Sequence, residues 1–202
     1  MVPDRSVSAR PSAPRVRSNF ACGEIVGVPS PLGHALAGAA AAGLILPYAA
    51  RGQTLVGRAW VRPAVAFGSI AVLPDLDLLW GNHSGPTHGI GAAVLAGLAA
   101  WLLVRALGWR NVDGGRVALA VAAAYGSHTL LDWMGQDSSP PIGIMALWPL
   151  SRSYFESDLH LFMAISRRYW RDGFLVHNLL AVGREIAILV PVLAAVIAAR
   201  RR

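Results

Sequence analysis

Five apolar stretches separated by short polar segments constrain the fold of this chain most strongly. They extend over residues 25–50, 63–80, 89–109, 117–133 and 186–199. A helix needs about 20 mostly apolar residues to cross the hydrocarbon core of a bilayer, and the last stretch, with 14 residues, is the shortest. Only 14% of all residues are charged, whereas a soluble domain carries about 25%. We therefore expect an all-α integral membrane bundle with four or five membrane-embedded helices.

Two further segments complete the expected organisation. Residues 1–30 are rich in Pro, Ser and Arg and contain no apolar run, which indicates a disordered basic tail rather than a signal peptide. Residues 153–171 mix aromatic side chains with arginines, a composition typical of an amphipathic helix on the bilayer surface. One membrane-embedded domain is thus expected over residues 31–202.

The charge of the chain points to a membrane surface. All 18 basic residues are arginines, and the net charge is +7. The arginines lie mainly between the apolar stretches and at the chain ends, and no nucleic-acid-binding motif accompanies them. We therefore expect the lipid bilayer as a partner and no nucleic acid. The single Cys22 excludes a disulfide framework and a cysteine-rich zinc site.

Seven His and Asp residues lie in or beside the first four apolar stretches. They are His34, Asp75, Asp77, His83, His88, His128 and Asp132. One such residue alone is more often a hydrogen-bonded bundle residue, but ionisable side chains are costly in apolar segments and usually mark function there. His128 and Asp132 are four positions apart and so project from one helix face. Imidazole and carboxylate together suit zinc, with manganese or iron as alternatives.

The order of the apolar stretches places all seven residues near one face of the membrane. If successive helices run in alternating directions, the start of the first stretch, the end of the second, the start of the third and the end of the fourth meet on the same side. We therefore expect a site for one or two divalent ions at one end of the bundle. His83 is either an additional ligand or a loop histidine.

Arginine counts in the short loops predict the orientation of this site. Residues 81–88, on the side of the site, contain no arginine, whereas residues 51–62 and 105–116 on the opposite side contain three each. Short arginine-rich loops near membrane spans stay in the cytoplasm. The site is therefore expected to face outward, although the total number of arginines is equal on the two faces.

Five short motifs occur in a fixed order along the chain. They are Gly33-His34, Pro74-Asp75-Leu76-Asp77, Thr87-His88, His128-x3-Asp132 and Trp148-Pro149-Leu150-Ser151. With these motifs, roughly residues 31–155 resemble the bacterial family of inner-membrane-bound, metal-dependent hydrolases of the YdjM type. The resemblance implies a multi-pass protein of the bacterial inner membrane with hydrolase activity on an unknown substrate.

A more distant similarity is to the zinc-dependent phospholipase C fold and its single-strand nuclease relatives, which use His, Asp, His and His-x3-Asp in this order. It implies that one ion is held by Asp75, His88, His128 and Asp132. Asp132 would also bridge to a second ion bound by His34.

Two departures from that fold limit the ion count. Its members use the N-terminal amine as a ligand, whereas 33 residues precede His34 here, and their later His…His-x3-Glu set is absent because His160, His177 and Glu185 have other spacings. We therefore expect at most two ions.

The function expected from these residues is hydrolysis by a metal-activated water. Asp77 or Asp75 would accept the proton of this water, and the other would ligate or orient. The substrate would be a membrane-associated ester, with a phosphoester favoured over a carboxylic ester. Two alternatives stay open: a metal-ion transporter, and a membrane-anchored regulatory or interaction protein in which the His and Asp residues are structural.

Overall fold

The computed structural model describes residues 29–46, 60–81, 83–137 and 140–200, and contains only helices and connecting segments in these ranges. The helices are α1 (Pro31–Gly43), α2 (Val61–Val72), η2 (Leu73–Trp80), η3 (Pro86–His88), α3 (Ile90–Ala106), α4 (Gly114–Trp133) and α5 (Phe174–Ala199), where η marks a 3-10 helix. The β-type pairing in the described part consists of isolated bridges, Gly135 with Phe162 and Ile144 with Phe155. The predicted all-α class is confirmed.

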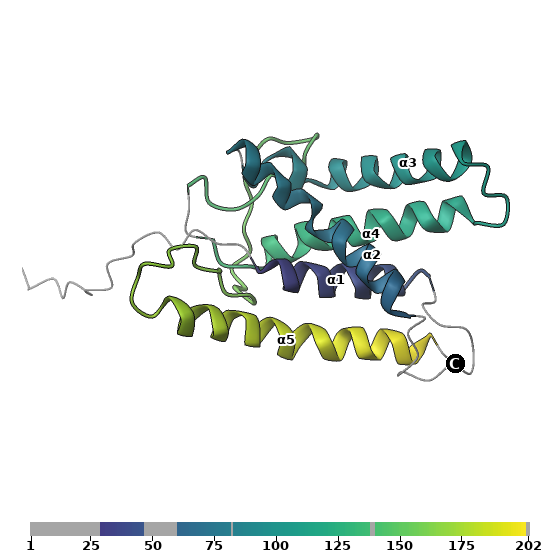
Figure 1. The fold of residues 1–202 in the computed structure, drawn as a ribbon. Helices are drawn as coiled ribbons and strands as arrows, with labels where there is room; N and C mark the ends of the chain where they lie inside the picture. Colours follow the sequence, from purple (N-terminus) through teal and green to yellow (C-terminus); the bar gives the residue numbers. More distant parts are fainter. Residues whose placement is uncertain (1–28, 47–59, 82, 138–139, 201–202) are drawn as a thin grey trace, which may run out of the picture.

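The short helix α1 lies at the centre of the bundle. It packs against α2, α4 and α5, while α3 packs on the far side of α4. Figure 1 shows α3, α4 and α5 extended along a common direction, with the start of α3, the end of α4 and the start of α1 directed toward the same end. The non-helical segment that follows α4 also lies at this end (Figure 1).

Small residues allow α1 and α2 to approach closely. A Cβ atom on Gly38 would lie 2.4 Å from the Cβ of Ala71, and one on Gly68 would lie 2.9 Å from the carbonyl oxygen of Ala35. The hydrophobic effect does not drive helices together in a membrane, because lipid tails are as apolar as the side chains. Helix association there depends on close packing of this kind. The contact fixes the position of η2, which continues directly from α2.

Two helical segments are long and apolar enough to cross a membrane in the described ranges, Val61–Trp80 and Phe174–Ala199. Helix α3 is apolar but shorter, and α1 covers only 13 residues. The prediction of four or five membrane-embedded helices is therefore not confirmed. Helix α5 begins 12 residues before the predicted stretch 186–199, because the residues that precede Ile186 continue the same apolar helix.

The helix predicted over residues 153–171 is wrong. Its first half is extended, because the backbone of Phe155 pairs with that of Ile144 in both directions at 2.9 and 3.0 Å. The N–H groups of Ser157 and Leu161 donate to the carbonyls of Trp133 and Met134 at the end of α4. These backbone groups are therefore unavailable for helical hydrogen bonds.

The predicted basic tail lies outside the described residues as far as residue 28. Its last residue, Ser30, is part of the packed structure: it is 5% exposed and caps α1 by accepting a hydrogen bond from the N–H of Gly33 at 3.1 Å.

We expect Gly38→Ala to lower the stability of the protein, because the new methyl group would overlap Ala71. Overpacking of this kind costs about 1–3 kcal/mol. The matched control is Gly183→Ala in α5, where a Cβ atom would meet nothing within 4 Å and where alanine favours the helix by up to about 1 kcal/mol. Thermal unfolding in detergent measures both variants; equal melting temperatures would contradict the close α1–α2 contact.

Candidate metal centre

Five of the predicted site residues come together where the helix ends meet. His34 lies in the first turn of α1, Asp75 in η2, His88 at the end of η3, and His128 and Asp132 in the last turns of α4. The three histidines are 0% exposed and Asp132 is 4% exposed. The cluster is thus enclosed by elements from four separate parts of the chain.

Ligand atoms of His88, His128 and Asp132 all lie within 4.8 Å of one another, and so do those of His34, Asp75 and His128. The Nε2 atoms of His128 and His88 lie 3.1 and 3.4 Å from Oδ2 of Asp132, and 3.7 and 3.9 Å from Oδ1 of Asp75. Ligands at about 2.0–2.1 Å from a tetrahedral zinc ion are about 3.3 Å apart. The separations from Asp132 are therefore close to those of ligands that share one ion, and the separations from Asp75 are longer.

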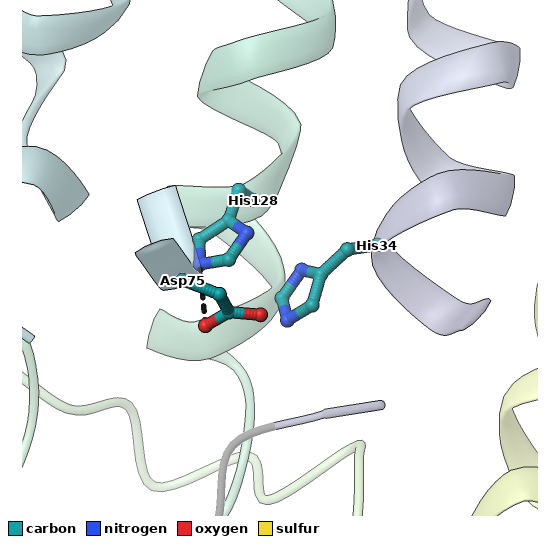
Figure 2. A group of neighbouring side chains, drawn as sticks. All are labelled: His34, Asp75 and His128. Carbon is teal, nitrogen blue, oxygen red and sulfur yellow. Dashed lines mark ion pairs between the residues drawn. The ribbon is translucent and has the colours of Figure 1, made fainter. Parts of the chain in front are cut away.

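His34 approaches the cluster from the other side of Asp132. Its Nε2 atom lies 3.3 Å from Oδ1 of Asp132, whereas His88 and His128 pair with Oδ2. The His34 ring stacks on that of His128 with centroids 3.8 Å apart. Figure 2 shows His34, Asp75 and His128 directed toward a common space from α1, η2 and α4. The Asp132 carboxylate therefore lies between His34 and the other ligands, where it can bridge two ions.

The nitrogen and oxygen atoms of this cluster that could bind a metal have no hydrogen-bond partners. This holds for both ring nitrogens of His34, Nε2 of His88 and His128, Oδ1 of Asp75 and both oxygens of Asp132. Buried polar atoms are nearly always hydrogen-bonded, and each unsatisfied one costs about 1–3 kcal/mol. Close approach without hydrogen-bonding geometry is the arrangement of ligands that share an ion. The residues present therefore fit a divalent metal.

Outer hydrogen bonds fix the orientation of two histidines. Nδ1 of His128 lies 2.7 Å from the carbonyl oxygen of Ala71. A carbonyl only accepts, so Nδ1 carries the proton and leaves the Nε2 lone pair directed at the cluster. Nδ1 of His88 is hydrogen-bonded to the Thr87 hydroxyl at 3.0 Å and forms an ion pair with Oδ2 of Asp77 at 3.2 Å, a carboxylate–histidine pair of the kind that supports metal ligands.

Asp77 contacts Nδ1 of His88 and belongs to none of the groups of ligand atoms. Its Oδ1 is 2.9 Å from Nδ1 of His83, and its Oδ2 accepts a hydrogen bond from the Thr87 hydroxyl at 2.7 Å. Both oxygens are therefore occupied by side chains of the turn between η2 and α3. Of the two aspartates in the Pro-Asp-Leu-Asp motif, Asp75 joins the ligand cluster, and Asp77 holds the turn.

His83 lies at the outer side of the site. Its side chain is 20% exposed, and its Nε2 atom has no hydrogen-bond partner. Ligand atoms of His83, Asp75 and His88 lie within 4.8 Å of one another, so these three residues form a further group able to hold an ion.

Neighbouring carboxylates dominate the electrostatics of His88. Burial disfavours the imidazolium and lowers the pKa of His88, but interactions with Asp75 and Asp77 and the negative charge of Asp132 outweigh burial and raise it to about 9. A proton on His88 therefore balances part of the carboxylate charge in the metal-free protein.

Sequence reasoning missed the role of Glu185. This residue of α5 is 0% exposed, and its carboxylate accepts hydrogen bonds from both the N–H (2.6 Å) and the hydroxyl of Ser30. A Cβ atom on Gly33 would lie 2.7 Å from Oε2 of Glu185. Glu185 thus fixes the first turn of α1, which carries His34. The available signal was a lone acidic residue within a long apolar segment.

We expect Glu185→Ala to destabilise the protein by about 1–3 kcal/mol, since it leaves the N–H and hydroxyl of Ser30 buried without an acceptor. Glu185→Gln keeps one acceptor oxygen of the same shape and should cost less. Thermal unfolding of both variants in the same detergent is the measurement. A wild-type melting temperature for Glu185→Ala would show that this contact does not hold α1.

Comparison with known proteins identifies the family. The model of the YdjM inner membrane protein family matches residues 30–201, which include every helix described above. No curated protein and no solved structure matches the chain, so the similarity to the phospholipase C fold is not shown. The match extends beyond the region of the predicted resemblance to the end of α5. The chain therefore belongs to the YdjM inner membrane protein family.

Proposed function

We propose that this protein is a metal-dependent hydrolase of the inner membrane that acts on a membrane-associated ester. The observation that carries the proposal is the convergence of buried donor atoms without hydrogen-bond partners from His34, Asp75, His88, His128 and Asp132. Histidine and carboxylate ligands without cysteine are typical of catalytic rather than structural zinc sites.

In this proposal Asp75, His88, His128 and Asp132 hold one ion, and Asp132 and His34 contribute to a second. Zinc is the preferred ion because histidine and carboxylate ligands suit it and because His88 and His128 lie 3.4 and 3.1 Å from Asp132, with manganese and iron as alternatives. His83 is an additional ligand available beside Asp75 and His88.

In this proposal, water and substrate reach the site beside Asp75, the most exposed of the five ligands. Its side chain is 11% exposed, whereas those of His34, His88, His128 and Asp132 are 0–1% exposed. A divalent ion bound there supplies a water with a pKa lowered toward 7. With Oδ1 directed at the ligands, Oδ2 of Asp75 is the atom that accepts a proton. Asp77 acts on the same chemistry indirectly, by fixing the ring of His88.

The surroundings of the site support a substrate at the bilayer surface. Leu79, Trp80 and Leu150 are 77%, 75% and 92% exposed near this end of the bundle, and exposed apolar and aromatic side chains of this kind favour the membrane interface. Helix α3 also exposes Leu95, Leu98 and Leu102, which supports embedding it in lipid although it is shorter than a full span. A phosphoester headgroup meets the ligands there without entering the hydrocarbon. By the arginine counts, this face is outside the cytoplasm.

We expect the purified protein to bind one or two zinc, manganese or iron ions per chain, and His128→Ala and Asp132→Asn to lose them. Each variant removes a donor atom that lies within 3.1–3.7 Å of other ligands. The control is His177→Ala, since His177 pairs with the carbonyl of Ala164 outside the cluster. Elemental analysis by mass spectrometry measures the ion content. Equal metal content in all four proteins would remove these residues as ligands.

We expect Asp75→Asn to reduce turnover by a factor on the order of 10²–10⁴, the contribution of a general base. Asp77→Asn should cost about 10–100-fold in metal affinity or activity, as for outer partners of ligands. The assay is hydrolysis of lipid and phosphoester substrates by metal-loaded protein in vesicles. Metal uptake into the vesicles without hydrolysis would favour a transporter. Partner binding that persists in the metal-free variants, with neither activity, would favour a regulatory protein.

A further inference from the structure

A second feature of the same end of the bundle is an apolar pocket of about 450 Å³ on the side of α4 next to the ligands. Its wall from α4 consists of Gly126, Thr129, Leu130 and Trp133, and the opposite wall comes from Ile90 and the segment 146–155. Its volume is within the range of about 300–1,000 Å³ for small-molecule sites. None of these side chains belongs to the metal cluster.

The pocket and the metal cluster share the same structural elements. Thr129 and Trp133 directly follow the ligands His128 and Asp132 in α4, and consecutive Cα atoms are about 3.8 Å apart. Residues 145–148 connect the two features as well: Met145 donates a backbone hydrogen bond to Ser84, next to His83, and Ala146 accepts one from Ile90 at 2.9 Å. The pocket therefore lies on the side of α4 that adjoins the ligand-bearing side.

One polar group inside the pocket has no partner. Thr129 is 6% exposed, and its hydroxyl makes no hydrogen bond, although threonine in a helix commonly donates to a carbonyl of the preceding turn. Ser127 on the same helix does so, donating to the carbonyl of Ala124 at 2.7 Å. An apolar pocket with one buried free hydroxyl suits an apolar chain that carries a hydrogen-bond acceptor.

The rim of the pocket is apolar and accessible. Ile90, Leu130 and Leu147 are 55%, 50% and 42% exposed, and the chain belongs to an inner membrane protein family. Among apolar ligands, lipid acyl chains are the ones present at this depth of a bilayer. Their ester carbonyl supplies the acceptor that the Thr129 hydroxyl lacks.

We propose that this pocket binds an acyl chain of the substrate, so that the substrate is an acylated lipid whose ester or phosphoester headgroup lies at the metal ligands. The Thr129 hydroxyl donates to the acyl ester carbonyl. This inference rests on the proposed hydrolase function and narrows its substrate class from membrane-associated esters to lipids.

The test is photo-cross-linking of the full chain in phosphatidylcholine nanodiscs that contain a phosphatidylglycerol with a diazirine on one acyl chain. Mass spectrometry maps the labelled residues. We expect labelling of Leu130, Trp133 and Phe155 to exceed labelling of the lipid-facing Leu98 and Leu102 of α3 several-fold. Equal labelling of pocket and α3 would show ordinary boundary lipid and overturn the proposal.

Variants that alter the pocket sharpen this test. Ala146→Trp fills the pocket from its wall and should reduce pocket labelling to the level of α3. Gly126→Val serves the same purpose if that variant does not fold, since a Cβ atom at Gly126 makes only ordinary contact, 3.6 Å from Ala93. Thr129→Val should weaken pocket labelling, whereas the control Ser127→Ala should not. Unchanged labelling in the filled, folded variant would contradict the pocket as the binding site.

The labelling does not depend on catalysis, so the two proposals fail separately. Pocket labelling in His128→Ala together with no hydrolysis by the metal-loaded wild type would support the pocket and refute the hydrolase. Hydrolysis of water-soluble phosphoesters by the wild type without pocket labelling would refute the pocket alone.

Discussion

The metal cluster contains buried histidine nitrogens and carboxylate oxygens that have no hydrogen-bond partners. Desolvating imidazole and carboxylate groups is costly unless something replaces their water, and the cluster between α1, η2, η3 and α4 leaves Nε2 of His88 and His128 and both oxygens of Asp132 without partners. One or two bound divalent ions would satisfy these atoms. Contacts outside the cluster position the elements that carry these atoms.

Each element that contributes to the cluster is held by a contact outside it. The close approach of Gly38 to Ala71 sets η2 beside α1, and Glu185 reaches from α5 to the cap residue of α1. Asp77 holds the turn that carries His88. Positioning therefore comes from small-residue packing and from two buried carboxylates that do not join the cluster, as expected for ligands that need support from a second layer of residues.

The sequence predicts most of the helices and the convergence of polar residues, because alternating apolar helices bring alternate ends to one face and the spacing of His128 and Asp132 places both on one side of α4. It does not show which of Asp75 and Asp77 faces the cluster, because the rotation of η2 is set by its contacts with α2, η3 and α4. The contact between Ser30 and Glu185 joins residues 155 positions apart, beyond any local pattern. The helix expected over residues 153–171 failed for a related reason: the end of α4 offers its backbone partners.

X-ray absorption spectroscopy of the zinc-loaded protein in nanodiscs tests the central claim most directly, because it reports the ligands of the ion itself. Zinc held by the cluster should have nitrogen and oxygen neighbours at about 2.0–2.2 Å, with outer-shell scattering from at least two imidazole rings that decreases in His88→Ala. A first shell of water oxygens without imidazole scattering, or a spectrum unchanged in His88→Ala, would contradict it.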